Sequence, residues 1–411
     1  MARVTDMTHG RPIRLILLFS LPLMLGSVFQ QLYTIVDTII IGRGVGMQAL
    51  ASIGAADWIN WLVLWGLQGF TQGFAILAAQ EFGAGAYDRL RRVLAMIIKL
   101  SCWFGIAVTI ISLLLVRPLL TLLHTDPAVF GGAQTYLYVQ FGGSLIIIAY
   151  NMAAAVLRCL GDSKTPLFAI IAASFANIAL DLLFVMGFGW GIFGASFATV
   201  LAQLIAFLLC LRSLRRLPFV QLTKADWKTD PAILLHLCRL GIPTGLQMSM
   251  ITLGGMVLQF VLNGFGVVFV AGYTAANKLY GILESASVAF GYAMTAYMGQ
   301  NRGARIDAGI RAVLALSAGF TAAIVTAMLL AGKPLLGLFL STEEAGAADA
   351  LAVAYQYLMV LMAFLFALFM LQAYRSSLQG LGEMTVPTIS GFAEMLMRMG
   401  AALVLPVFIG K

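Results

Sequence analysis

The stretch LRCLGDSKTP (157–166) recurs in altered form as LQGLGEMTVP (378–387), about 220 residues later. Three more pairs of segments repeat at the same or a slightly shorter separation: Pro22 with Pro243, AAQEFGAG (78–85) with YMGQNRGA (297–304), and RPLLTLL (117–123) with KPLLGLF (333–339). Self-similarity at a fixed period marks a chain built from copies of one unit. The sequence therefore predicts an internal duplication.

The composition indicates the medium in which the two copies fold. Hydrophobic residues make up 61% of the 411 residues, charged residues only 10%, and the mean hydropathy is +0.96. Soluble proteins carry about 25% charged residues. Apolar runs of about 20 residues, the length of a membrane-crossing helix, recur here without the period-two alternation of barrel strands. We therefore expect an all-α polytopic membrane protein.

Hydropathy and helix breakers predict about eleven spans: 13–42, 50–80, 93–122, 133–158, 165–187, 191–212, 234–263, 267–298, 308–331, 350–374 and 385–409. Arginine and lysine gather in alternate loops, and cytoplasmic loops carry such an excess. The N-terminus is therefore predicted to be cytoplasmic, in a chain located in the cell inner (plasma) membrane. The net charge of +8 follows this loop pattern, so it predicts contact with membrane lipids and not with nucleic acid.

The duplication sets the domain boundaries. We expect an N-terminal six-helix lobe over 1–212, a polar cytoplasmic linker over 213–231 and a C-terminal lobe over 232–411. Because six is even, both copies enter the membrane from the same side and are related by a pseudo-two-fold axis along the membrane normal. Only 24 residues follow Pro387, so the counterpart of the sixth span is missing. We expect a truncated second lobe of about five helices, from a twelve-helix parent.

Two carboxylates stand inside predicted spans of the first lobe. Asp37 lies in LYTIVDTIIIGR (32–43), where an acid at a helix centre costs about 2.5–3.5 kcal/mol. Asp181 lies at a similar depth of the fifth span, and Asn177 precedes it by one turn on the same face. Charge repulsion and burial both favour capture of a proton or a cation by such a pair.

The alternative is that both acids cap or flank helix ends. The second repeat offers a control, because Leu258 and Ala402 stand at the positions that match Asp37 and Asp181. The fold does not require an acid there, which favours a functional role. The sequence thus predicts a cation-coupling site.

Two residues of the first span are candidates for supporting roles. Pro22 breaks the helical hydrogen-bond ladder about four turns before Asp37, creating a kink that could change as the acid gains or loses its cation. A static packing kink is the alternative. Tyr33, one turn before Asp37, either hydrogen-bonds to it or packs.

Other charged residues fall within the predicted spans of the second lobe. Lys278 and Glu284 are six residues apart and off a shared face, so they need partners on other helices or a wet cavity; both are candidate cavity residues. Glu394 and Arg398, four apart on one helix, are expected to neutralise each other.

Signatures of catalysis are absent from the sequence. The chain has no GxSxG, HExxH, Walker lysine motif or dinucleotide fingerprint. The longest polar loop, about 20 residues, cannot hold a nucleotide-binding domain. We therefore expect no enzyme and no organic cofactor, and energy from an ion gradient or a partner.

The chain resembles the multidrug and toxic compound extrusion (MATE) transporters. The matching segments cover nearly all of it: LPLMLGSVFQQLYTIVDTIIIGRGVG (21–46), AAQEFGAGAYDRLRR (78–92), LGDSKTP (160–166), FANIALDLLF (175–184), GIFGASFATVLAQ (191–203), and AANKLYG (275–281) through GQNRGA (299–304). The resemblance implies two six-helix lobes around a cavity that faces each side of the membrane in turn.

The family's coupling site carries over to this chain. Its first-helix Asp, fifth-helix Asn and Asp, and sixth-helix Thr match Asp37, Asn177, Asp181 and Thr199. The acids that another branch places in the seventh and tenth helices are absent, which favours the DinF-like branch, here lacking the twelfth helix. The resemblance implies H+ at this site, or Na+ held by Asp37, Asp181 and Asn177.

The expected function is a monomeric antiporter that exports amphiphilic, often cationic drugs by alternating access in exchange for H+ or Na+. One alternative is a flippase of lipid-linked saccharide from the same superfamily, although such proteins generally need a more basic cavity. The other is a non-transporting membrane subunit or fragment.

Overall fold

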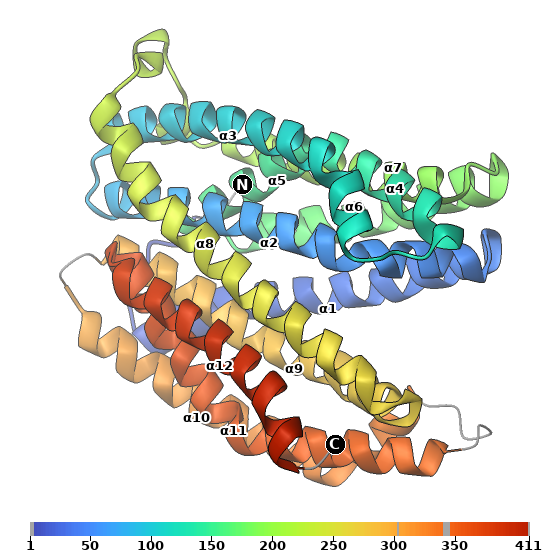
Figure 1. The fold of residues 1–411 in the computed structure, drawn as a ribbon. Helices are drawn as coiled ribbons and strands as arrows, with labels where there is room; N and C mark the ends of the chain where they lie inside the picture. Colours follow the sequence, from blue (N-terminus) through green and yellow to red (C-terminus); the bar gives the residue numbers. More distant parts are fainter. Residues whose placement is uncertain (1–3, 302–303, 340–345, 410–411) are drawn as a thin grey trace.

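A computed structural model describes residues 4–301, 304–339 and 346–409, and this part of the chain contains α-helices and no strand. The helices in chain order are α1 Pro12–Gly44, α2 Met47–Gly83, α3 Tyr87–Leu122, α4 Pro127–Gly142, α5 Ser144–Cys159, α6 Lys164–Asp181, α7 Gly191–Leu214, α8 Pro231–Leu262, α9 Val267–Gln300, α10 Ile306–Gly337, α11 Ala347–Leu381 and α12 Thr385–Ile409 (Figure 1). The predicted all-α fold is confirmed.

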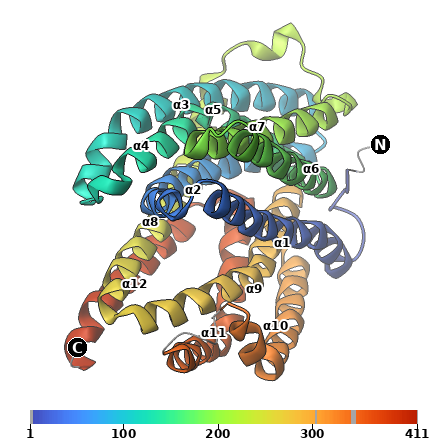
Figure 2. The ribbon, with the colours of Figure 1, turned by 90° about the vertical axis from the view of Figure 1, so that its right-hand side faces the viewer.

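The helices form two lobes, α1 to α7 and α8 to α12 (Figure 2). In the first lobe α1 packs on α6, and α2 packs on α4 and α5. In the second lobe α8 packs on α12, and α9 packs on α11, which is the same pairing one repeat later. Between the lobes, α2 packs on α8 and α1 packs on α9. The predicted two-lobe repeat is therefore confirmed.

Length and composition qualify eight of the described helices as membrane spans, or nine if α4 and α5 count as one bent span. The helices α9 and α12 are not among them, although they have 34 and 25 residues. Lys278 and Glu284 lower the apolar character of α9. The predicted count of about eleven spans is reached when these two are included.

The fourth predicted span, 133–158, is not one straight helix. The chain bends by 50° between α4 and α5, at Gly143. A Cβ at Gly143 would lie 2.5 Å from Cγ2 of Val200 on α7. The bend therefore follows from a glycine that lets α7 pack directly against the backbone, which a hydropathy profile does not report.

The Gly143→Ala variant is expected to be less stable by about 1–3 kcal/mol, because the added methyl group overlaps Val200. The loss should appear as a lower midpoint of thermal unfolding in detergent. The matched control is Gly142→Ala, where no atom lies within 4 Å of the new Cβ. Equal midpoints for the two variants would contradict the packing explanation, whereas Val200→Ala should rescue Gly143→Ala.

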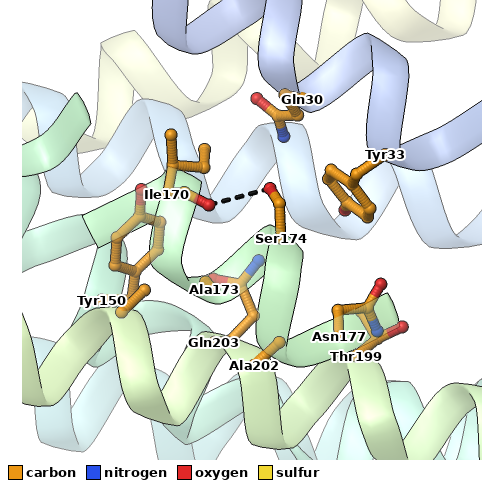
Figure 3. A pocket seen from close by; sticks show the side chains of 11 residues that line it. Gln30, Tyr33, Tyr150, Ile170, Ala173, Ser174, Asn177, Thr199, Ala202 and Gln203 are labelled. Carbon is orange, nitrogen blue, oxygen red and sulfur yellow. Dashed lines mark hydrogen bonds between the residues drawn. The ribbon is translucent and has the colours of Figure 1, made fainter. Parts of the chain in front are cut away.

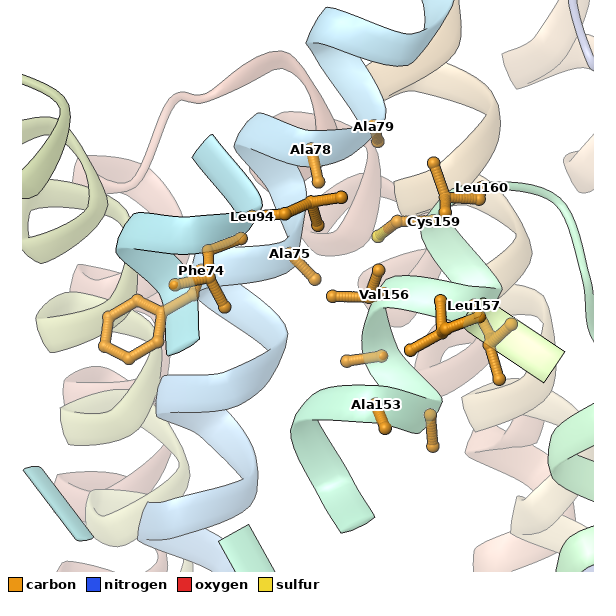
Figure 4. Packing of buried hydrophobic residues seen from close by; sticks show 14 of the residues in the cluster. Phe74, Ala75, Ala78, Ala79, Leu94, Ala153, Val156, Leu157, Cys159 and Leu160 are labelled. Carbon is orange, nitrogen blue, oxygen red and sulfur yellow. The ribbon is translucent and has the colours of Figure 1, made fainter. Parts of the chain in front are cut away.

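Small side chains bring the helices of the first lobe close together. Ala75 and Ala78 of α2 face Ala153 and Val156 of α5 in a fully apolar cluster (Figure 4). Alanine lets two helix backbones approach closely, which is the usual means of tight packing between membrane helices. This cluster fixes the orientation of α2.

The lobes also meet where α2 and α9 end. Gly83 of α2 lies against Gln300 of α9 so closely that a Cβ would overlap the Gln300 carbonyl oxygen. Nearby, the Gln80 side-chain amide donates to the carbonyl oxygen of Gly380 on α11 at 3.1 Å. Backbone therefore meets backbone at this end of the interface.

Residues 4–10, named here the N-terminal clasp, cross this junction. The Thr5 backbone N–H donates to the Gly161 carbonyl of the first lobe at 3.1 Å. The fully buried Met7 exchanges hydrogen bonds with Gln300 and Asn301 of the second lobe, at 2.9 and 2.8 Å. The clasp thus bonds to both lobes at once.

Candidate functional site

The two predicted acids of the first lobe lie together. Asp37 is on α1 and Asp181 is the last residue of α6, and these helices pack side by side. Their carboxyl groups contact each other. Asp181 is fully buried, and Asp37 is half-buried. Repulsion between two carboxylates at such a place is strong unless a proton or a cation lies between them.

Five polar atoms at this place have no hydrogen-bond partner within the protein. They are both carboxyl oxygens of Asp181, both amide atoms of Asn177 and Oδ1 of Asp37. Asn177 is only 1% exposed. Buried polar atoms are nearly always bonded, and an unsatisfied one costs about 1–3 kcal/mol. The group is therefore suited to receive a ligand that these atoms bind.

Asn177 also lines a small pocket with Thr199 and Tyr33 (Figure 3). Figure 3 shows Asn177 and Thr199 next to each other, with Tyr33 across from them. The Thr199 hydroxyl donates to the carbonyl oxygen of Ala195 at 3.1 Å, so its own lone pairs stay available. The other polar residues of the lining are Gln30, Tyr150, Ser174 and Gln203.

The backbone is irregular next to the acid pair. After Asp181 the chain continues as a π-helix, Leu182–Gly187. Such wide turns are rare and occur often at functional sites. Pro22 is buried inside α1, where it removes one rung of the hydrogen-bond ladder, but it is not one of the pocket residues. At 1.5 Å per residue it lies about 22 Å from Asp37 along the helix.

Three further residues join the site that the sequence interpretation did not include. Asp57 of α2 lies within electrostatic range of Asp37, and Tyr136 of α4 lies within range of both acids. The Asn60 side-chain amide donates to the Tyr136 hydroxyl at 3.2 Å. Asp57 and Asn60 are three apart and share a helix face, which was the available signal.

The remaining candidates lie in the second lobe. Lys278 and Glu284 are on α9, and Glu284 lies within electrostatic range of Arg398 and Glu394 on α12. The Arg398 guanidinium donates to Glu394 Oε1 at 2.6 Å, so the predicted neutralising pair is confirmed. The structure therefore groups Glu284 with this pair and not with Asp37.

The chemistry of the first-lobe site fits a proton or an alkali ion. Across residues 4–301, 304–339 and 346–409, no group of three or more His, Cys, Asp or Glu side chains is arranged to hold a metal ion. The groups at the site are carboxylate, amide and hydroxyl oxygens from Asp37, Asp181, Asn177 and Thr199. Hard cations prefer oxygen ligands, whereas zinc and copper prefer nitrogen and sulfur.

The family model described as MatE matches residues 22–183 and again residues 243–404. Probable multidrug resistance protein YpnP of Bacillus subtilis (strain 168) is 35% identical over 305 residues, which are 72% of this chain and 67% of that protein. Probable multidrug resistance protein YoeA of the same organism is 27% identical over 355 residues, 84% of this chain and 76% of that protein.

Solved structures share the fold. A crystal structure of MATE in complex with MaL6 has a TM-score of 0.86 and 24% identity, covering 99% of this chain and 90% of that one. An outward-facing conformation of a multidrug resistance MATE family transporter of the MOP superfamily has a TM-score of 0.88 and 24% identity, covering 98% and 90%.

Proposed function

This chain belongs to the MATE family of multidrug transporters, and from that premise we propose that it is a cation-coupled antiporter. It exports amphiphilic, often cationic drugs in exchange for H+ or Na+. It does so in the cell inner (plasma) membrane, with its N-terminus in the cytoplasm. The names of its relatives as probable multidrug resistance proteins support small-molecule substrates.

The observation that carries the proposal is the contact between Asp37 and Asp181, with their unpartnered oxygens. A proton or monovalent cation entering from outside removes one of the two negative charges of the pair and draws α1 toward α6. Its departure restores repulsion between the two helices. Because α1 also packs on α9, a movement of α1 reaches the second lobe. The missing rung at Pro22 makes α1 easier to bend between these contacts.

The alternating cycle follows from this exchange. Drug binds when the first-lobe site is empty of its cation, and the occupied site favours the arrangement that releases drug outward. A ligand can drive such a change only through its different affinity for the two arrangements. The chain has 20 Met and 27 Phe, residue types that repack around varied amphiphiles.

The flippase alternative is not favoured. Its lipid-linked substrates carry phosphate, which calls for unneutralised cations within the protein. Both Arg375 and Arg398 pair with Glu394, at 3.1 and 2.6 Å. The named relatives are multidrug transporters, not flippases.

The test is transport by the purified chain in proteoliposomes loaded with ethidium. A pH gradient and a Na+ gradient are imposed separately, each with the membrane potential clamped. We expect one of the two gradients to drive ethidium movement and the other to have no effect. Ethidium movement that ignores both gradients would reject cation coupling, and absence of movement under any condition would reject drug transport.

A further inference from the structure

The two repeats can be placed in register residue by residue. The second family match begins 221 residues after the first and has the same length. Packing agrees with this register: Gly26 of α1 faces Ile170 of α6, and one repeat later Gln247 of α8 faces Gly391 of α12. The glycine of this contact is on α1 in the first lobe and on α12 in the second, yet the same two positions of the repeat are in contact in both lobes.

In this register Arg398 stands where the first lobe has Asn177, and Gly254 stands where it has Tyr33. The Arg398 side chain crosses α8 at the glycine, since a Cβ on Gly254 would lie 3.3 Å from Arg398 Cδ. The space that an aromatic ring takes in the first lobe thus admits an arginine in the second. The counterparts of Asp37 and Asp181 are Leu258 and Ala402, which carry no charge.

Acidic and basic side chains of the protein itself pair with one another around Arg398. Glu394 accepts from Arg398 at 2.6 Å and from Arg375 at 3.1 Å, and Arg375 also donates to Ser390 Oγ at 2.7 Å. Arg375 is only 7% exposed. Glu284 lies within electrostatic range of Arg398 and Glu394, so two guanidinium groups and two carboxyl groups gather here. The cluster also joins α11 to α12.

We propose that Arg398 is a built-in cation, which takes in the second lobe the role that the exchangeable cation takes in the first. A guanidinium group stays charged and cannot leave. The pairing of Arg398 and Arg375 with Glu394 therefore holds α12 to α11 permanently, whereas the contact between α1 and α6 tightens only when a cation binds. The second lobe therefore does not respond to the ion gradient, and only the first lobe responds to it. This inference rests on the proposed function.

Removing the fixed charge tests the proposal. In Arg398→Ala, Glu394 and Glu284 face Arg375 alone, so one carboxylate is in excess and recruits an external cation. The Hill coefficient of ethidium transport for the driving cation should rise from about 1 to about 2, the ceiling for two sites. Arg398→Lys keeps a fixed charge and should keep the wild-type coefficient. The double variant R398A/E284Q restores the balance and should also return to about 1.

Three results overturn the proposal: an unchanged coefficient in Arg398→Ala, equal impairment of Arg398→Ala and Arg398→Lys, or a double variant no better than the single one. If Arg398→Ala does not reach the membrane, insertion of R398A/E284Q supports charge balance, and failure of both shows a packing role only.

The proposed function is judged separately, by wild type and Asp37→Asn in the same vesicles. If ethidium transport by wild type does not depend on a cation, the proposed function is rejected, whatever the Arg398 variants do.

Discussion

Replacing Asp37 with asparagine is expected to abolish gradient-driven ethidium efflux while the protein still folds and inserts. Asparagine keeps the shape of the side chain but cannot bind a proton or neutralise a cation. Loss of one charged partner in a buried site costs about 2–5 kcal/mol, which is at least about 30-fold in cation affinity. The measurement is the initial rate of efflux in proteoliposomes as the driving cation is varied.

The second repeat supplies a matched control for this variant. Leu258 stands at the position of Asp37 one repeat later, so Leu258→Asn places the same amide at the equivalent point of α8. This control should keep its dependence on the gradient. Asp181→Asn should behave like Asp37→Asn, because the two carboxyl groups act as one pair. Wild-type cation dependence in either acid variant would remove the pair from the coupling mechanism.

The second large effect is expected from Gly83→Ala at the end of α2. The new methyl group would overlap the Gln300 carbonyl oxygen, which belongs to the backbone and has no rotamer to escape into. The ends of α2 and α9 must separate, and overpacking of this kind costs about 1–3 kcal/mol, occasionally more. We expect a shift of about 5- to 150-fold toward arrangements in which this end is open, and a fall in transport rate.

Cysteine labelling provides the measurement. A cysteine introduced at Gln80, which is buried against Gly380, should react with a water-soluble thiol reagent faster in the Gly83→Ala background. Gly54→Ala on the same helix is the control, because no atom lies within 4 Å of its new Cβ. Equal labelling rates in the two backgrounds would show that the Gly83 contact does not hold this end closed.

The repeat in the sequence predicted the two lobes correctly, because the duplicated segments set both the lobe count and the register. Counting residues from the helix ends placed Asp37 and Asp181 at one depth, and the structure brings them together. Whether they couple transport to a cation stays a prediction. The depth of a residue along its helix can be estimated from the sequence because every α-helix rises by the same distance per residue.

Lateral neighbours could not be predicted in the same way. Asp57 and Tyr136 reach the acid pair because α2 and α4 lie beside α1, and helix order in a bundle is set by packing that no single helix encodes. The pair of Glu394 and Arg398 was predictable because both are on one helix. Arg375, the other partner of Glu394, comes from α11 and was missed. The bend at Gly143 was missed because Val200, which fills it, is on α7.

The N-terminal clasp also has a consequence for the order of events during biosynthesis. Met7 is among the first residues to leave the ribosome, but its bonding partners Gln300 and Asn301 are made 293 and 294 positions later. At a translation rate of about 5–20 residues per second, Met7 waits about 15–60 s for them. The clasp therefore closes only after the first lobe and α9 have been inserted, so burial of Met7 reports that α9 has reached the first lobe.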